Sequence, residues 1–222
     1  MHRTMPWQQL VLTFVMLVIS TAVIAYNGWD MQLASRFYLP GQGFPIGNLQ
    51  PWKAMYRFGE WPAFLTGGLG LIIWLASFTL PRLVKLRKAA LFIALVLIIG
   101  PGLLVNWGFK DHWGRPRPRQ VTQLGGTMAF HQPWQPGPAP KNASFPAGHP
   151  SAAFYMSVPY FVLRRTRPSQ ALLWLWGGFA FGLLMGATRI IQGGHFLSDV
   201  VWSAGFVYLT ALVLAALLHP ER

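Results

Sequence analysis

The stretch "ALFIALVLIIGPGLLVNWGFKDHWGRPRP", residues 90–118, joins an uncharged apolar run directly to a dense basic cluster. A transmembrane helix needs about 20 mostly apolar residues, and residues 90–109 meet that requirement. Lys110, Arg115 and Arg117 follow at once, interrupted by glycine and proline. One or two basic anchors are usual where a helix leaves a bilayer. The density of this cluster therefore indicates a role beyond anchoring.

The composition of the whole chain is that of a membrane protein. Of its 222 residues, 53% are hydrophobic and 10% are charged, against roughly 25% charged in ordinary soluble domains. No cysteine is present, which excludes disulfides and thiolate metal sites. The net charge is +13, but the cations lie between apolar segments and no nucleic-acid signature appears, so no nucleic-acid partner is expected. We expect one integral membrane domain over residues 1–222.

The remaining apolar segments predict further transmembrane helices. The segment 151–163 is the shortest of them and contains Pro159. The first segment has a signal peptide as its alternative, because Arg3 precedes it, but its apolar run is longer than usual and favours a retained helix. The sequence thus predicts an all-α, six-helix transmembrane bundle with spans at residues 10–26, 61–80, 89–109, 151–163, 171–188 and 196–218.

Two short basic loops predict the orientation of these helices. The loops hold seven cations and no acid, which marks them as cytoplasmic, with Arg3 and Arg222 on the same side. The end of the third span, the start of the fourth and the junction of the last two then share the outer face. We expect a multi-pass protein of the bacterial inner membrane with its active site facing the periplasm, since outer-membrane proteins are barrels. The seven cations are Arg82, Lys85, Arg87, Lys88, Arg164, Arg165 and Arg167.

The basic motif, residues 110–118, lies on the outer face under this topology, where the charge rule does not place cations. An anionic ligand explains it, because arginine offers planar bidentate donors to a phosphate and lysine a point charge. Anchoring to lipid headgroups is the alternative. Lys110 and Arg117 are the candidate phosphate ligands, and Arg115, Arg119 and His112 are candidate contacts to a second phosphate or a sugar headgroup.

The second motif is "SFPAGHPSAAF", residues 144–154, called here the PAGH motif. Pro146 and Gly148 predict a turn just before an apolar helix, and the free backbone N–H groups of a helix start bind anions. We expect the backbone of Ala147 and Gly148 to bind phosphate and His149 to donate a proton.

The third motif is "TRIIQGGHFLSDV", residues 188–200, called here the His–Asp motif. His195 and Asp199 are four residues apart, so they share one helix face. An aspartate held against one imidazole nitrogen makes the other more nucleophilic. A purely structural pair is the alternative, but an ionisable residue inside a span is costly, which favours a function for Asp199. Arg189 is a further candidate phosphate ligand.

Together the three motifs resemble the signature of the type 2 phosphatidic acid phosphatase (PAP2) family: Lys-x6-Arg-Pro, Pro-Ser-Gly-His and Ser-Arg-x5-His-x3-Asp. Two positions depart from it. Ala147 replaces a serine that contacts the phosphate in relatives, for which Ser144 or Ser151 could compensate, and Thr188 replaces another serine. The loop 119–141 is similar to that of bacterial lipid A phosphatases.

The resemblance implies metal-independent phosphoryl transfer through a phosphohistidine, without a cofactor. His195 would attack phosphorus and Asp199 would orient it. Lys110, Arg117 and Arg189 would hold the phosphoryl oxygens, while His149 would act as general acid and base. Of the five acidic residues, only Asp111 and Asp199 are expected near the site, too few for a two-metal centre.

The expected activity is hydrolysis of a lipid phosphate that enters from the outer leaflet. Candidate substrates are lipid A, undecaprenyl pyrophosphate, phosphatidylglycerol phosphate and phosphatidic acid. The same residues would serve a lipid phosphotransferase, and a non-catalytic lipid-phosphate transporter or binding protein would need the cations alone. The aromatic segment 27–60 either lines the lipid entrance or forms an interfacial belt. The sequence does not specify an oligomeric state.

Overall fold

The computed structural model describes residues 6–139 and 143–221. Within these ranges the chain forms helices and loops without a strand, and its only β pairing is two isolated bridges, Leu39 with Gly43 and Val121 with Met128. The predicted all-α class is therefore confirmed. Arg3 and Arg222, which we placed on the cytoplasmic side, lie outside the described residues.

Five helical segments of the described chain are long and apolar enough to cross a membrane, and each overlaps a predicted span. The second consists of α3 (Trp52–Phe58) and α4 (Trp61–Ala76), and the third of η2 (Pro81–Leu86), α5 (Arg87–Leu97) and the π-helical η3 (Ile98–Lys110). The other three segments are α1 (Trp7–Tyr26), α8 (Pro168–Ile191) and α9 (Leu197–Leu218). The protein is therefore a multi-pass membrane protein.

The segment predicted to span at 151–163 is helical but broken. It runs through α6 (Gly148–Phe154), η6 (Tyr155–Ser157) and α7 (Pro159–Leu163), and Pro159 explains the break because it has no N–H to continue the ladder. This run packs tightly against α8. A Cβ on Gly178 would lie 2.2 Å from the Ser157 backbone nitrogen, so only glycine allows the approach.

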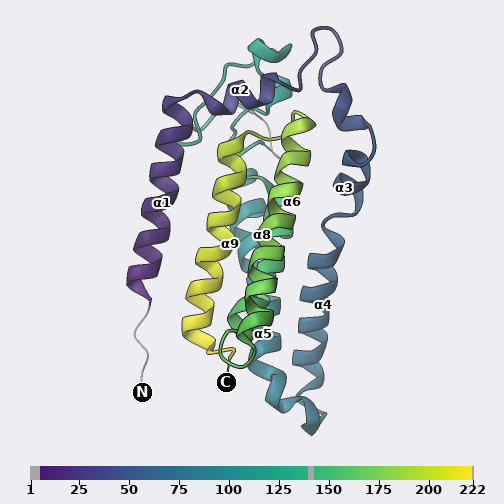
Figure 1. Cartoon of the computed structure of the whole chain (residues 1–222), viewed down its shortest axis with the longest axis vertical. Helices are drawn as coiled ribbons and strands as arrows, with labels where there is room; N and C mark the ends of the chain where they lie inside the picture. Colours follow the sequence, from purple (N-terminus) through teal and green to yellow (C-terminus); the bar gives the residue numbers. More distant parts are fainter. Residues whose placement is uncertain (1–5, 140–142, 222) are drawn as a thin grey trace.

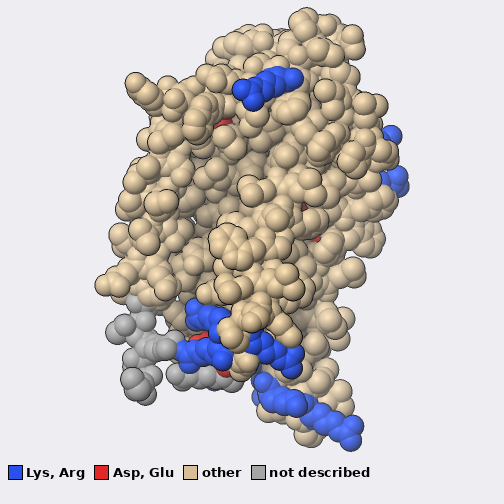
Figure 2. Space-filling view, viewed as in Figure 1, with Lys and Arg blue, Asp and Glu red and all other residues tan. Residues whose placement is uncertain are grey.

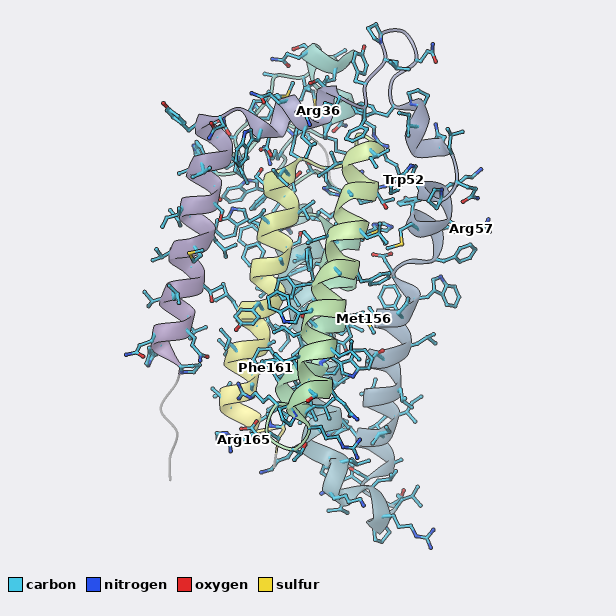
Figure 3. The ribbon with its side chains drawn as sticks, in the orientation of Figure 1. Arg36, Trp52, Arg57, Met156, Phe161 and Arg165 are labelled. Carbon is cyan, nitrogen blue, oxygen red and sulfur yellow. The ribbon has the colours of Figure 1, made fainter. Side chains whose placement is uncertain are left out.

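The helices form an elongated bundle whose two ends differ in character (Figure 1). The start of α1, the end of α9, the α4–α5 junction and the α7–α8 loop lie at the lower end, where most of the Lys and Arg on this face gather (Figure 2). Arg165 marks this end, whereas Trp52 of α3 and Arg36 mark the upper one (Figure 3). The ends of η3 and α8 and the start of α6 lie in the upper half, so the three motifs meet away from the cationic loops. Short helices α2 (Trp29–Ser35), η1 (Pro45–Asn48), η4 (Pro118–Gln120) and η5 (Thr122–Leu124) cover the upper end.

Helix α1 stands at the side of the bundle and exposes most of its apolar side chains. In water such a surface would aggregate, but in a bilayer it faces lipid. Lipid removes the hydrophobic drive for helices to associate, so small residues and polar contacts hold α1 to α9. Leu17 packs where Gly205 has no Cβ, and Trp202 donates its indole N–H to Thr21 at 2.9 Å.

The π-helical η3 delivers the first residue of the basic motif to the upper end. Pro101 has no backbone N–H to donate to the helix. Its carbonyl oxygen accepts a hydrogen bond from the Asn106 side chain at 2.7 Å. Such widened helical turns occur frequently at functional sites. Lys110 is the last residue of the segment.

Candidate active site

A cavity of about 590 Å³ opens where the three motifs meet. The basic motif and the residue after it supply Lys110, Arg117 and Arg119, the PAGH motif supplies His149, and the His–Asp motif supplies Arg189. Apart from Gln192 of the His–Asp motif, the rest of the wall comes from the segment before α4, including two of its aromatic residues, so that segment lines the cavity. The additional lining residues are Gly43, Phe44, Gly47, Asn48, Lys53, Tyr56 and Gln192.

Three cations of the cavity are almost fully buried: Lys110, Arg117 and Arg189 are each less than a tenth exposed. Burial, and Arg119 close by, lower the pKa of Arg117. Arg189 lies over the Tyr56 ring, 4.5 Å from its centroid, and its Nε has no partner in the described structure. Clustered buried cations repel one another unless an anion binds between them. The cavity therefore suits a doubly charged group such as a phosphate.

Two glycines allow these cations to approach the backbone. A Cβ on Gly148 would lie 2.9 Å from the Lys110 Nζ, and one on Gly194 would lie 2.5 Å from the Arg189 Nη2. Because Gly148 of the PAGH motif has no side chain, the ammonium group of Lys110 can lie close to the start of α6. Gln192 fixes the arginine, since its side chain accepts a hydrogen bond from Arg189 and donates one to the Gly47 carbonyl at 3.1 Å.

His195 is fully buried, next to Gly194 and the Arg189 guanidinium. Its Nδ1 lies 2.6 Å from the Ser144 carbonyl oxygen, which can only accept, so Nδ1 carries the proton. Its Nε2 therefore holds a lone pair, and no atom of the described residues hydrogen bonds to it. An imidazole in this tautomer, held by its other nitrogen, is chemically a nucleophile.

Asp199 does not hold His195 directly, contrary to the expectation from their spacing. Its Oδ2 lies 3.7 Å from Nδ1, beyond a hydrogen bond. The carboxylate instead accepts from the Ser144 hydroxyl, the Phe196 N–H and the Arg115 guanidinium. Ser144 thus connects the two residues, because its hydroxyl binds Asp199 and its carbonyl binds His195. The nearby negative charge still favours an imidazolium.

The expected headgroup contact of Arg115 is wrong. Arg115 is fully buried, does not line the cavity and pairs with both Asp30, at 2.8 Å, and Asp199. It also donates to the His131 carbonyl at 2.9 Å and lies over the Phe196 ring at 4.6 Å. Two carboxylates compensate the buried charge, so Arg115 joins α2 to the start of α9 and does not face a ligand.

His112 is not among the residues that line the cavity, and its expected headgroup contact stays a prediction. It is exposed, and its Nδ1 lies 2.9 and 3.0 Å from the Trp107 and Gly108 carbonyls at the end of η3, where it caps the helix. Arg119 is exposed and does line the cavity.

The expected phosphate-binding amide of Ala147 points elsewhere. Its N–H approaches the Asp199 carbonyl at 3.3 Å, and its side chain is buried in an apolar cluster. The two serines proposed to compensate for it are also engaged: Ser144 donates to Asp199, and Ser151 donates to the Gly148 carbonyl at 2.6 Å.

Glu60 and Asp30 correct the expectation that only Asp111 and Asp199 lie near the site. The Glu60 Oε2 lies 3.4 Å from the His149 Nε2, and the His149 ring stacks on Tyr56 with centroids 4.7 Å apart. Glu60 lies within Trp52–Ala76, a segment long enough to span the membrane, and an ionisable residue in such a segment is a signal of function that the sequence already carried. Across residues 6–139 and 143–221, no three His, Asp or Glu side chains gather as metal ligands would.

Acidification is expected to destabilise the folded protein through its two site histidines. Burial, with the neighbouring cations, lowers the pKa of His149 and of His195 to about 3, whereas an unfolded histidine takes a proton below about pH 6.5. Between these values the unfolded chain binds more protons, so stability falls as the pH falls. Thermal unfolding in detergent should show a lower midpoint at about pH 5 than at about pH 7. The dependence should be shallower in His149→Gln, and equal slopes in both proteins would contradict this origin.

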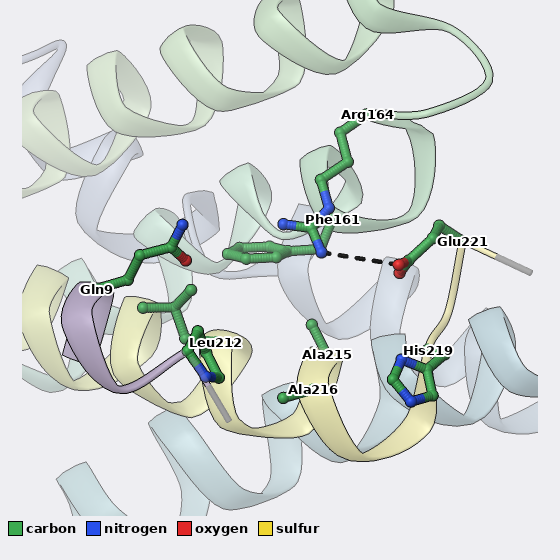
Figure 4. A pocket seen from close by; sticks show the side chains of 9 residues that line it. Gln9, Phe161, Arg164, Leu212, Ala215, Ala216, His219 and Glu221 are labelled. Carbon is green, nitrogen blue, oxygen red and sulfur yellow. Dashed lines mark ion pairs between the residues drawn. The ribbon is translucent and has the colours of Figure 1, made fainter. Parts of the chain in front are cut away.

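A second, smaller cavity of about 160 Å³ lies at the opposite end of the bundle (Figure 4). Phe161, Leu212 and the ion pair between Arg164 and Glu221, at 3.8 Å, contribute to its wall. No residue of the three motifs lines it, so it is not a candidate for the phosphate chemistry.

Comparisons with known proteins agree with this geometry. The family model described as the PAP2 superfamily matches residues 86–222. Lipid A 4'-phosphatase of Francisella tularensis subsp. novicida (strain U112) is 36% identical over 202 residues, covering 90% of each chain. Lipid A 4'-phosphatase of Rhizobium leguminosarum is 37% identical over 142 residues, which cover 62% of this chain and 58% of that protein.

A solved structure extends the likeness to the fold. The transmembrane PAP2-type phosphatidylglycerolphosphate phosphatase from Bacillus subtilis superposes with a TM-score of 0.52 at 20% identity, covering 96% of this chain and 97% of the other. The family match, the relative that aligns over 90% of each chain and the shared fold lead to the same assignment. The chain belongs to the PAP2 superfamily and is a membrane lipid phosphatase.

Proposed function

We propose that this protein hydrolyses a phosphate monoester of lipid A, at the 4' position, through a phosphohistidine at His195. The observation that carries the mechanism is the bare Nε2 of His195, its tautomer set by the Ser144 carbonyl. His195 is buried and is not among the cavity-lining residues, but the guanidinium of Arg189, one of the three buried cavity cations, lies against the adjacent Gly194. The substrate rests on the full-length relative whose name is lipid A 4'-phosphatase. Lys110, Arg117 and Arg189 hold the phosphoryl oxygens in this proposal.

The reaction proceeds in two displacements. The Nε2 lone pair of His195 forms a bond to phosphorus while the bond to the leaving oxygen breaks, and that oxygen keeps the electron pair and takes a proton from His149. A water then gives a proton to the neutral His149, and its oxygen bonds to phosphorus. The phosphorus–nitrogen bond breaks and returns its electron pair to His195. Asp199 stabilises the charge on the imidazole, and the cavity cations offset the charge on the phosphoryl oxygens.

The proposed topology has six crossings, with the segment 151–163 as the one that is not a continuous helix. Most of it is buried against α8 and its neighbours, where a broken helix is tolerated because protein surrounds it. The two cationic loops lie at the end of the bundle opposite the cavity, which favours a cytoplasmic position for them and a periplasmic site in the inner membrane. Residues 1–222 act as one domain.

The test is phosphate release by the detergent-purified protein in the presence of EDTA, on lipid A, undecaprenyl pyrophosphate, phosphatidylglycerol phosphate and phosphatidic acid. We expect release that EDTA does not lower and that is fastest with lipid A. Faster release from another lipid would reassign the substrate. Release only after an acceptor lipid is added would indicate a phosphotransferase, and tight binding without release would indicate a binding protein.

Arg119 is expected to contact the headgroup at the exposed wall of the cavity. An exposed cation contributes less than about 1 kcal/mol to binding, so Arg119→Ala should raise KM by less than about sixfold and leave kcat unchanged. Arg57→Ala is the matched control, because Arg57 is also exposed but does not line the cavity. Steady-state kinetics on lipid A measure both. A large fall in kcat for Arg119→Ala would place it among the catalytic groups instead.

A further inference from the structure

Glu60 is a carboxylate that lies against His149, a residue of a cavity otherwise suited to an anion. It comes directly after the turn between α3 and α4, is about a quarter exposed and lies near two of the buried cations, Lys110 and Arg189. A negative charge there weakens the binding of a phosphate, since like charges repel. Its presence therefore needs a function other than substrate binding.

The geometry around Glu60 is directed at His149. The Oε2 of Glu60 lies 3.4 Å from the His149 Nε2, and the Tyr56 ring stacks on the imidazole with an interplanar angle of 21°. The ring is thus held on one face by Tyr56 and at one nitrogen by Glu60. The second ring nitrogen is left for the substrate. This is the arrangement of a general acid with a positioning partner.

Three cations act on His149, and Glu60 is the carboxylate that lies against it. Lys110 of η3, Arg117 of the basic motif and Arg189 of α8 all act on His149 and disfavour its protonated form. Tyr56 of α3 stacks on its ring. A general acid must nevertheless carry a proton when the leaving oxygen departs.

We propose that Glu60 is the positioning residue of His149: the pair holds the proton that His149 delivers to the leaving oxygen. The proposal rests on the proposed function, because it assigns a partner to the acid of that reaction. Glu60 remains a carboxylate throughout. With the substrate phosphate bound among the cations that otherwise disfavour its protonated form, His149 is an imidazolium before the first displacement and neutral after it, and the water of the second displacement restores the proton.

The proposal predicts that the effect of Glu60 depends on the leaving group. An alkyl phosphate leaves as a strongly basic alkoxide and needs an acid, whereas 4-nitrophenyl phosphate leaves as a weakly basic phenolate and does not. Glu60→Gln should lower kcat on octyl phosphate by about 10- to 100-fold, a part of the 10²- to 10⁴-fold that general acids contribute. On 4-nitrophenyl phosphate the same variant should keep nearly its parent rate.

Two further variants sharpen the experiment. Glu60→Asp keeps the carboxylate and should restore part of the octyl phosphate activity. Glu221→Gln is the matched control, because Glu221 pairs with Arg164 and Arg165 at the other end of the bundle, and both of its rates should equal those of the parent. Size-exclusion chromatography and thermal unfolding in detergent establish that each variant is folded.

The outcomes separate this proposal from the function on which it rests. If His195→Ala and His149→Ala lose octyl phosphate hydrolysis while Glu60→Gln keeps it, the proposed function stands and the pairing is wrong. An equal fall on both substrates would make Glu60 a binding or structural residue and also overturn the pairing. If the parent hydrolyses neither substrate, or His195→Ala is as active as the parent, the proposed function itself fails.

Discussion

Replacing His195 with alanine is expected to lower kcat by at least about 10⁴-fold, because removal of a covalent nucleophile commonly costs that much or more. The structure gives the physical reason. His195 is fully buried and follows Gly194, which lies against the Arg189 guanidinium; its Nδ1 is bound to a carbonyl, and its Nε2 has no partner in the described residues. In that setting the lone pair of Nε2 is available for phosphorus. Single-turnover and steady-state phosphate release on lipid A measure the loss.

The matched control is His112→Ala. His112 follows the end of η3, is exposed, caps η3 and does not line the cavity. Its replacement should leave kcat unchanged. Substantial activity in His195→Ala, with the control normal, would mean that water attacks phosphorus directly and that His195 is structural.

Replacing Arg115 with alanine is expected to cost about 3–5 kcal/mol of stability, the range for breaking a buried ion pair from one side. Asp30 and Asp199 would both remain buried, at 3% and 0% exposure, without their shared cation. Activity should fall as well, because Asp199 and the Ser144 that it binds position His195. The measurement is thermal unfolding in detergent, with activity assayed at a temperature where the variant is folded.

Two further variants test whether the loss of stability comes from the buried carboxylates that are left without a cation. Arg115→Lys should recover little, because an ammonium cannot replace the planar fork that reaches two carboxylates at once. Arg115→Leu combined with Asp30→Asn should be more stable than Arg115→Leu alone, since the second change removes one of the uncompensated charges. Arg36→Ala, an exposed arginine at the same end, is the control. A stability of Arg115→Ala equal to that control would contradict the argument.

The sequence predicted the parts of the site that depend on topology and spacing. Apolar length located five spans that the structure also contains, and the distribution of loop cations brought Lys110, His149 and Arg189 to the same end of the bundle. The segment 151–163, the shortest predicted span, is not a continuous helix for a physical reason. Pro159 interrupts its backbone ladder, and its helices are held by packing against α8 rather than by their own length.

Side-chain partners were less predictable, because they depend on contacts between distant residues. The Asp30–Arg115 pair spans 85 positions, and nothing local distinguishes Arg115, which points inward, from Arg119, which lines the cavity. The acceptor for His195 is a backbone carbonyl, which leaves no mark in a sequence. Spacing placed Asp199 on the correct helix face, but three closer donors occupy its carboxylate.

The most direct test of a covalent histidine mechanism is to trap the intermediate. Protein mixed with ³²P-labelled lipid A is quenched in alkali during turnover, and the label is located by peptide mass spectrometry. The phosphohistidine mechanism predicts a phosphoryl group on His195 that is stable in alkali, lost in acid and absent from His195→Ala. Turnover without any bound label under conditions that preserve phosphohistidine, or a label on another residue, would contradict it.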